Sequence, residues 1–158
     1  MKFPSFEMER MQSVWEHKVK YDLSESGVEP LTLEEAARDT GRRVGAHLAR
    51  RGDPSVYVSS FWWSALEGAR ETATTVRRAY VFASSPPRHA LIAEARRSGL
   101  WALHPNRAYV TEELVRDAHA GDLWIQAWTV NEVVEIARFA ALGVDGIMSD
   151  FPERIPKV

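Results

Sequence analysis

The sequence contains no cysteine among its 158 residues. This absence excludes disulfides, thiolate nucleophiles and cysteine-based metal sites. Long apolar runs are also missing, since no stretch approaches the ~20 residues that a helix needs to cross a bilayer. The opening residues, MKFPSFEMERMQSVWEHK, include acidic side chains and no uninterrupted apolar block, unlike a secretory signal. We therefore expect no transmembrane segment and a cytoplasmic protein.

The chain also has no large excess of positive or of negative charge. The net charge is −2, so the chain lacks the basic footprint of a nucleic-acid-binding protein. Four arginine doublets lie in or beside helical patterns, which is typical of solvated helix faces; they occupy positions 42–43, 50–51, 77–78 and 96–97. We predict no nucleic-acid partner.

Several common motifs of catalysis and nucleotide binding are absent. The sequence has no Walker loop, no Gly-x-Gly-x-x-Gly and no His-Glu-x-x-His. Ser59 and Ser60 lack the Gly-x-Ser-x-Gly elbow of a serine hydrolase. We therefore exclude a P-loop nucleotide-binding protein, a dinucleotide-binding protein, a metalloprotease with the His-Glu-x-x-His motif and a serine hydrolase with this elbow.

A regular alternation of short apolar runs and helical patterns is present instead. Helical patterns separate the predicted strands, which cover residues 14–22, 55–61, 79–83, 100–104, 123–128 and 144–149. This alternation is typical of a parallel sheet buried on both faces. The length fits a single domain, residues 1–158. About six parallel strands suit either a doubly wound sheet or part of a (β/α)8 barrel.

Two of the predicted helices have well-marked ends. Thr32 followed by Glu35 predicts a capping box at the start of the first helix, and Gly52 predicts its end. Asn131 predicts the N-cap of the last helix, and Gly143 follows its end.

The candidate site residues lie on or just after the predicted strands, because both architectures bind ligands at the carboxyl ends of strands. Glu16 and Lys18 are two residues apart on one strand and so point to the same side. Buried there without partners they would be costly; the alternative is a solvated pair on an edge strand. Trp128 and Phe61 each end a strand, either as packing aromatics or as contacts to a substrate. His104 also ends a strand, and we interpret it as a loop histidine.

Four stretches stand out by their order and spacing, and they cover nearly the whole chain. They are WEHKVKYD at 15–22, VYVSSF at 56–61, WTVN at 128–131 and GVDGIMSDFPERI at 143–155. They resemble the Glu-x-Lys strand, the Ser-Ser-Phe strand, the penultimate strand and the final strand of the glycerophosphodiester phosphodiesterase family, with Ser149 in place of the usual threonine. Members of that family are (β/α)8 barrels. The resemblance implies an α/β fold of the incomplete (β/α)8, TIM-barrel type.

The resemblance also implies roles for four residues. Trp128 would pack against the glycerol part of the substrate, because an aromatic face covers the apolar edge of a polyol, and Phe61 would be a second substrate-binding residue. Lys18 would bind the substrate phosphate as a point charge. Glu16 would bind a divalent cation, Ca²⁺ or Mg²⁺, weakly or not at all, since affinity grows with the number of charged ligands.

Other signatures of the family do not occur in these 158 residues. Members carry a strand ending in His-Arg-Gly, a Glu-x-Asp strand and a His-Asp pair, which supply the acid and base histidines and further metal ligands. A barrel of this kind usually needs about 250 residues. We therefore identify no catalytic residue. The resemblance implies a metal-dependent phosphoric diester hydrolase of lipid and glycerol metabolism, which converts a glycerophosphodiester and water to glycerol 3-phosphate and an alcohol. We expect this chain alone to be inactive.

Three explanations of the missing strands stay open. The first is a truncated gene or a wrongly chosen start codon. The second is a split barrel, completed by a homo-oligomer or by a complementing N-terminal chain, since unpaired strand edges favour association. The third is a pseudo-enzyme that serves as a binding or interaction module. Outside the family, a doubly wound binding domain with chance signatures would need Glu16 and Lys18 exposed and Trp128 away from any cleft.

Overall fold

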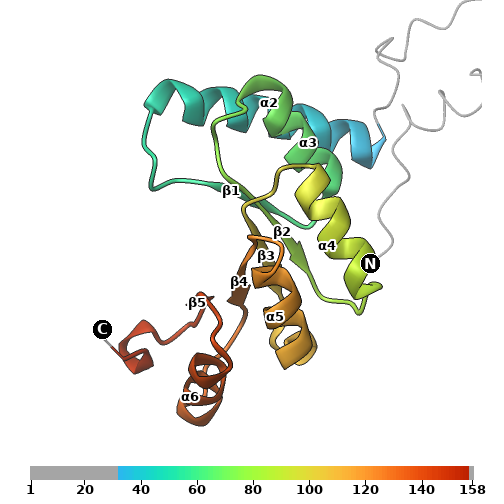
Figure 1. Ribbon diagram of the computed structural model, residues 1–158. Coiled ribbons are helices and arrows are strands. Elements are labelled where there is room, and N and C mark those ends of the chain that lie inside the picture. Colours follow the sequence, from blue (N-terminus) through green and yellow to red (C-terminus); the bar gives the residue numbers. More distant parts are fainter. Residues whose placement is uncertain (1–31, 157–158) are drawn as a thin grey trace, which may run out of the picture. The chain divides into compact units, whose positions relative to one another are not determined.

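The computed structural model describes residues 32–156 of the chain. In this part five parallel strands form one sheet in the order β1-β2-β3-β4-β5 (Figure 1). The strands are β1 (Val58–Ser60), β2 (Arg78–Phe82), β3 (Ala102–Pro105), β4 (Trp124–Ala127) and β5 (Gly146–Ile147). The predicted alternation is confirmed for these five, and the first predicted strand, residues 14–22, lies outside the described residues.

A helix precedes the sheet and four more connect its strands. They are α2 (Leu33–Arg51), α3 (Trp63–Thr72), α4 (Arg88–Arg97), α5 (Glu112–His119) and α6 (Val133–Leu142). Two short 3-10 helices, η1 (Arg107–Tyr109) and η2 (Pro152–Arg154), follow β3 and β5. Parallel neighbours require such crossovers, because a tight hairpin cannot return the chain to the same strand direction. No helix within residues 32–156 is long and apolar enough to cross a membrane.

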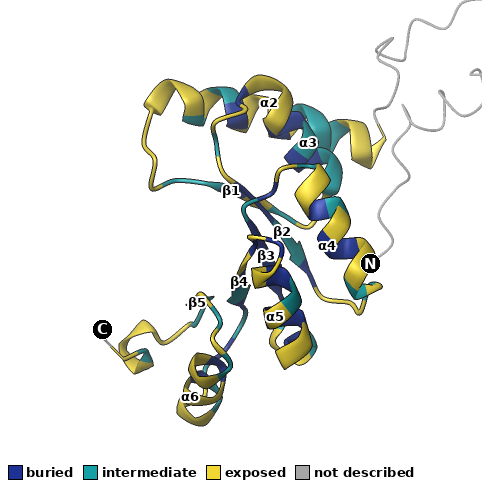
Figure 2. Cartoon of the chain, viewed as in Figure 1, coloured by how far each residue is buried: buried dark blue, intermediate teal, exposed yellow. Residues whose placement is uncertain are grey.

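The hydrophobic core lies between the sheet and the helices. Figure 2 shows buried positions along the strands and on parts of the helices beside them. Strand residues Phe82, Leu103 and Ile125 share this core with helix residues such as Leu91 and Phe139. Their burial supplies the apolar contact that holds each helix against the sheet.

The other face of the sheet carries a set of aromatic and polar side chains. The Tyr57 hydroxyl donates a hydrogen bond to Gln126 Oε1 at 3.1 Å. The Tyr57 ring lies 5.1 Å from the Trp101 ring and 5.7 Å from the His104 ring, and the Trp101 and Trp124 rings are 5.0 Å apart. Alternation along β3 and β4 places His104 and Gln126 on the face opposite the core residues Leu103 and Ile125.

Helix α2 is positioned by close packing against α3. Only two of its residues, Gly41 and Gly45, are buried. A Cβ atom at Gly41 would lie 1.9 Å from the Ala65 carbonyl oxygen, and one at Gly68 would lie 2.0 Å from the Arg38 carbonyl oxygen. The missing side chains therefore allow the two helix backbones to touch.

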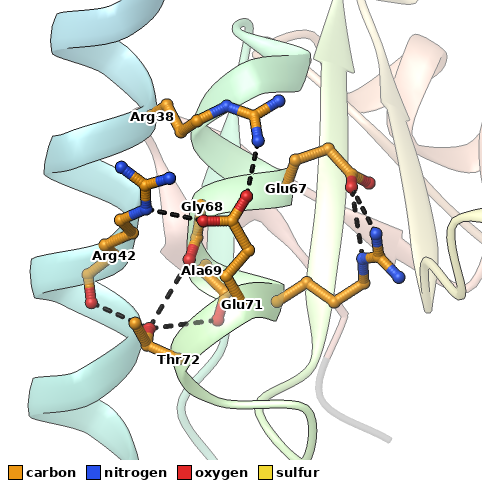
Figure 3. A network of polar contacts seen from close by, with 8 residues as sticks. Arg38, Arg42, Glu67, Gly68, Ala69, Glu71 and Thr72 are labelled. Atoms are coloured by element: carbon orange, nitrogen blue, oxygen red, sulfur yellow. Dashed lines mark hydrogen bonds and ion pairs between the residues drawn. The ribbon is translucent and has the colours of Figure 1, made fainter.

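Charged side chains support the same helix pair, as Figure 3 shows. Arg38 and Arg42 of α2 bind the Glu71 carboxylate of α3 at 2.5 and 2.6 Å, and the Thr72 hydroxyl donates to the Arg42 carbonyl oxygen at 2.8 Å. The Arg42 hydrogen bond is the main reason that the pKa of Glu71 is lowered. The predicted ends of α2 are confirmed, since Thr32 and Glu35 form the capping box and Gly52 adopts the left-handed conformation with φ 64°.

Strand β5 has only two ladder residues, and a side chain secures its amino end. Asp145 Oδ2 accepts the Ile125 backbone N–H at 2.7 Å and lies 2.8 Å from His119 Nε2 on α5. The Asp145 N–H donates to the Ile125 carbonyl oxygen at 2.9 Å. One carboxylate therefore joins β4, β5 and α5.

The interpretation of the arginine doublets as solvated helix faces is wrong at positions 77–78. Arg78 is the first residue of β2 and is buried, and its Nη2 donates to the carbonyl oxygens of Ser98 and Gly99 at 3.0 Å each. Burial lowers the pKa of Arg78. Its guanidinium lies at the C-terminal end of α4, where unpaired carbonyl groups favour a cation. The guanidinium of Arg77 lies over the Trp101 ring.

The close contact between α2 and α3 predicts that a substitution that normally stabilises a helix will destabilise this protein. Alanine normally favours a helix over glycine by about 1 kcal/mol, but Gly68→Ala would push a methyl group into the α2 backbone. We expect the free energy of unfolding to fall by about 1–3 kcal/mol, as overpacking does, measured by urea unfolding. Thr40→Ala on the exposed side of α2 is the control and should not destabilise. A Gly68→Ala protein as stable as the parent would contradict the close approach.

Candidate functional site

Two of the predicted site residues come together at the carboxyl ends of the strands. Phe61 follows β1 and is 56% exposed, whereas Trp128 follows β4 and is half-buried. Their ring centroids are 5.5 Å apart and the ring planes meet at 89°. Edge-to-face packing at this distance is a favourable aromatic arrangement. The two residues form one aromatic wall, although 67 positions separate them in the sequence.

Backbone groups of β3 hold Trp128 in place. Its indole Nε1 donates to the His104 carbonyl oxygen at 2.7 Å, and its own N–H donates to the Pro105 carbonyl oxygen at 3.1 Å. The Arg107 N–H in turn donates to the Trp128 carbonyl oxygen at 2.6 Å. The indole N–H, which is the only polar group of the side chain, is therefore hydrogen-bonded, and the ring faces Phe61. Trp128 thus has a defined orientation at the end of the sheet.

Asn131 connects the carboxyl ends of β4 and β5. Its Oδ1 accepts hydrogen bonds from the Ser149 hydroxyl at 3.2 Å and from the Asp150 N–H at 3.0 Å, and its Nδ2 donates to Asp150 Oδ2 at 2.9 Å. Arg154 Nη1 donates to the Asn131 carbonyl oxygen at 2.8 Å. We call Asn131, Ser149, Asp150 and their mutual hydrogen bonds the Asn131 clamp.

The predicted N-cap of the last helix is therefore wrong. Glu132, without a side-chain cap hydrogen bond, is the N-cap of α6. The Asn131 amide is used by β5 instead, since its oxygen already accepts two hydrogen bonds there. The other end of this helix is confirmed, because Gly143 adopts the left-handed conformation with φ 80°.

The interpretation of His104 as a loop histidine is also wrong. His104 lies in β3 and is 0% exposed, and neither ring nitrogen has a hydrogen-bond partner. Its ring meets the Tyr57 ring nearly edge-on at 83°. Burial lowers the pKa of His104 from 6.5 to about 4, because the imidazolium would lose its hydration. The side chain is neutral at physiological pH.

The predicted charged pair, Glu16 and Lys18, lies outside the described residues. Within residues 32–156 no group of three or more histidine, aspartate or glutamate side chains is placed to hold a metal ion. The residues of this part therefore do not fit a divalent cation by themselves, and we derive no chemical step through a metal.

Comparisons with known proteins agree with this geometry. The sequence profile of the Glycerophosphoryl diester phosphodiesterase family matches residues 3–154. The chain belongs to this family. A glycerophosphodiester phosphodiesterase from Bacillus altitudinis is 46% identical to it over 57 residues, which are 35% of this chain and 23% of that protein.

Solved structures of the family share the fold. A crystal structure assigned to a glycerophosphoryl diester phosphodiesterase from Silicibacter pomeroyi is 32% identical, with a TM-score of 0.68, over 81% of this chain and 46% of that one. A phosphodiesterase from Oleispira antarctica, solved with the product sn-glycerol-3-phosphate, is 22% identical, with a TM-score of 0.67, over 77% of this chain and 49% of that one. The chain thus spans about half the length of these solved relatives. The predicted incomplete (β/α)8 barrel is confirmed.

Sequence patterns alone did not reveal two features of the site. The Asn131 clamp was missed because asparagine before a helix has the ordinary signature of an N-cap. A signal was nevertheless present, since WTVN and the Ser149–Asp150 pair stand one helix length apart in the sequence. The contact between Tyr57, just before β1, and Gln126 of β4 joins segments that are distant in sequence, and no local pattern points to it.

The buried histidine predicts a specific pH dependence of stability. Between pH 6.5 and about 4 the unfolded chain binds a proton at His104 that the folded chain does not, so this contribution to stability is present above pH 6.5 and is lost as the pH falls toward 4. At about 1.4 kcal/mol per pH unit, the loss is about 3 kcal/mol. Urea unfolding near neutral pH and near pH 4 should show a smaller pH effect in His104→Leu than in the parent. His47→Gln, on the exposed side of α2, is the control, and equal pH effects in all three proteins would contradict the assignment.

Proposed function

We propose that the aromatic wall of Phe61 and Trp128 is the glycerol-binding surface of a phosphoric diester hydrolase site that takes glycerophosphodiesters. The observation that carries this proposal is the meeting of the two rings, 5.5 Å apart, at the carboxyl ends of β1 and β4. Ligands of parallel α/β folds bind at this end of the strands. Aromatic faces cover the C–H edges of a polyol, while its hydroxyl groups stay free for polar partners or water.

Lys18 and Glu16 complete the proposed site. This part of the proposal rests on the resemblance of WEHKVKYD to the Glu-x-Lys strand of the family. By that resemblance Lys18 would bind the substrate phosphate and Glu16 a divalent cation, Ca²⁺ or Mg²⁺.

The described residues bind and orient rather than transfer protons. His104 is neutral and has no exposed surface, so it cannot exchange a proton with a substrate at the wall. The 158 residues contain none of the family's His-Arg-Gly, Glu-x-Asp or His-Asp signatures. We infer that hydrolysis to glycerol 3-phosphate and an alcohol needs the strands that carry these signatures.

An alternative function is supported by the same observations. A chain that keeps the glycerol wall without acid and base histidines can act as a binding or interaction module. The free edge of β1 in the described sheet, whose only described neighbour is β2, offers unpaired backbone groups to another strand.

Binding of sn-glycerol 3-phosphate tests the wall. Removing one indole from a polyol contact should weaken binding at least about tenfold, because each 1.4 kcal/mol of contact free energy corresponds to a factor of ten. We expect this for Trp128→Ala by isothermal titration calorimetry. Trp124→Ala, at the opposite end of the same strand, is the matched control and should bind as the parent does. No saturable binding by the parent, or equal loss in both variants, would overturn the proposed wall.

Hydrolysis tests the inferred inactivity. We expect the 158-residue chain alone to release no glycerol 3-phosphate from glycerophosphocholine or glycerophosphoethanolamine, with Ca²⁺ or Mg²⁺ added. The physical reason is that the sequence carries none of the family signatures that supply the acid and base histidines, so proton transfer at the reacting oxygens lacks its usual groups. Metal-dependent turnover that disappears in Glu16→Gln would show the inactivity to be wrong and Glu16 to be a working ligand.

A further inference from the structure

We propose that Asn131 is a positioning residue: its side-chain amide fixes the carboxyl ends of β4 and β5 and thereby sets the orientation of Trp128 in the aromatic wall. The importance of this orientation for substrate rests on the proposed function. The positioning itself is a property of the chain without ligand and can be measured separately.

The hydrogen bonds of the Asn131 side chain use all of its polar atoms in directions that suit an amide. Both ends of the Asn131 amide are used, the oxygen for Ser149 and the Asp150 N–H, and the nitrogen for the Asp150 carboxylate. A hydrogen bond to a charged acceptor is stronger than a neutral one. An amide is the side chain that can accept from a hydroxyl and a backbone N–H while donating to a carboxylate.

The β-ladder between β4 and β5 alone gives little support to β5. Strand β5 consists of Gly146 and Ile147, which pair with Gln126 and Ala127. Two further backbone hydrogen bonds lie next to this ladder. The Met148 N–H donates to the Ala127 carbonyl oxygen, and the Val130 N–H donates to the Met148 carbonyl oxygen. So short a strand needs side-chain support at its ends. Asp145 provides it at the amino end, and the Asn131 clamp at the carboxyl end.

A short stretch of chain connects the Asn131 clamp to the indole of Trp128. Only Thr129 and Val130 separate Trp128 from Asn131, and Val130 is fully buried. Hydrogen bonds to β3 hold one end of this connection, through Trp128, and the clamp on β5 holds the other. Interiors are close-packed, so a shift at one end is transmitted along the connection. The indole direction therefore depends on both anchors.

The clamp also gives a physical meaning to the two paired signatures. WTVN ends with Asn131, and Ser149 and Asp150 follow β5 after Met148. Helix α6 separates them in sequence, yet the amide binds both residues directly. The residues Trp-x-x-Asn and Ser-Asp are thus the two halves of one hydrogen-bonded unit.

The variants exploit the polarity of the amide. Asn131→Asp keeps the acceptor for Ser149 and the Asp150 N–H but replaces the donor with a carboxylate that faces Asp150. The double variant Asn131→Asp with Asp150→Asn restores a donor–acceptor pair in the reverse direction. Thr40→Asp is the control for the added negative charge, because Thr40 lies on the exposed side of α2 and takes no part in the clamp.

A second pair of variants keeps the test decisive where Asn131→Asp does not fold. Ser149→Ala removes one hydrogen bond to Asn131 Oδ1 and another from the Phe151 N–H to the hydroxyl, whereas Ser149→Thr retains the hydroxyl group. Positioning predicts a shift of the Trp128 signal in Ser149→Ala and none in Ser149→Thr.

The measurement is ¹⁹F NMR of the full chain with fluorinated tryptophan, free of ligand, with the Trp128 signal among the six tryptophans assigned by Trp128→Phe. We expect Asn131→Asp to shift or broaden the Trp128 signal while the other five stay in place, the double variant to restore it, and Thr40→Asp to leave it unchanged. An unmoved Trp128 signal in Asn131→Asp, no recovery in the double variant, or a similar change in all six signals would overturn the proposal. Titration of the parent with sn-glycerol 3-phosphate is the separate test of the wall: an unresponsive Trp128 signal refutes the proposed function and leaves the positioning result intact.

Discussion

The requirement that parallel strands be joined by crossovers organises everything else in this chain. Each of the strands β1 to β4 is followed by a helix that returns the chain to the end of the sheet where the next strand begins. The carboxyl ends of all five strands therefore lie at the same end of the sheet. Apolar burial between sheet and helices fixes that arrangement, with Leu103 and Ile125 fully buried at its centre. Phe61 and Trp128 become neighbours only through this constraint.

The helices are held by two different kinds of contact. Helices α3 to α6 bury apolar side chains against the strands, as Leu66 and Phe139 illustrate. Helix α2 instead meets α3 through glycines and a ring of charged hydrogen bonds around Glu71, with few apolar groups buried. Close backbone approach yields many weak contacts that compensate for the small apolar area.

The site combines rigid placement with polar groups that are not all satisfied within the described residues. Trp128 has its indole N–H bonded and its ring against Phe61, whereas both ring nitrogens of His104 lack partners. A buried polar group without a hydrogen bond is costly.

Sequence alone determined the strand–helix alternation, the capping of α2 and the family membership, because these depend on local periodicity, on residues three positions apart and on short motifs. It also singled out Phe61 and Trp128, but as separate strand ends. The tertiary structure decided what needs contact across the sheet: that the two rings pack together, that His104 is buried and neutral, and that Asn131 binds β5 rather than capping α6. The physical reason is that an asparagine before a helix has several partners within reach, and only the packing of strands brought together by the fold selects one of them.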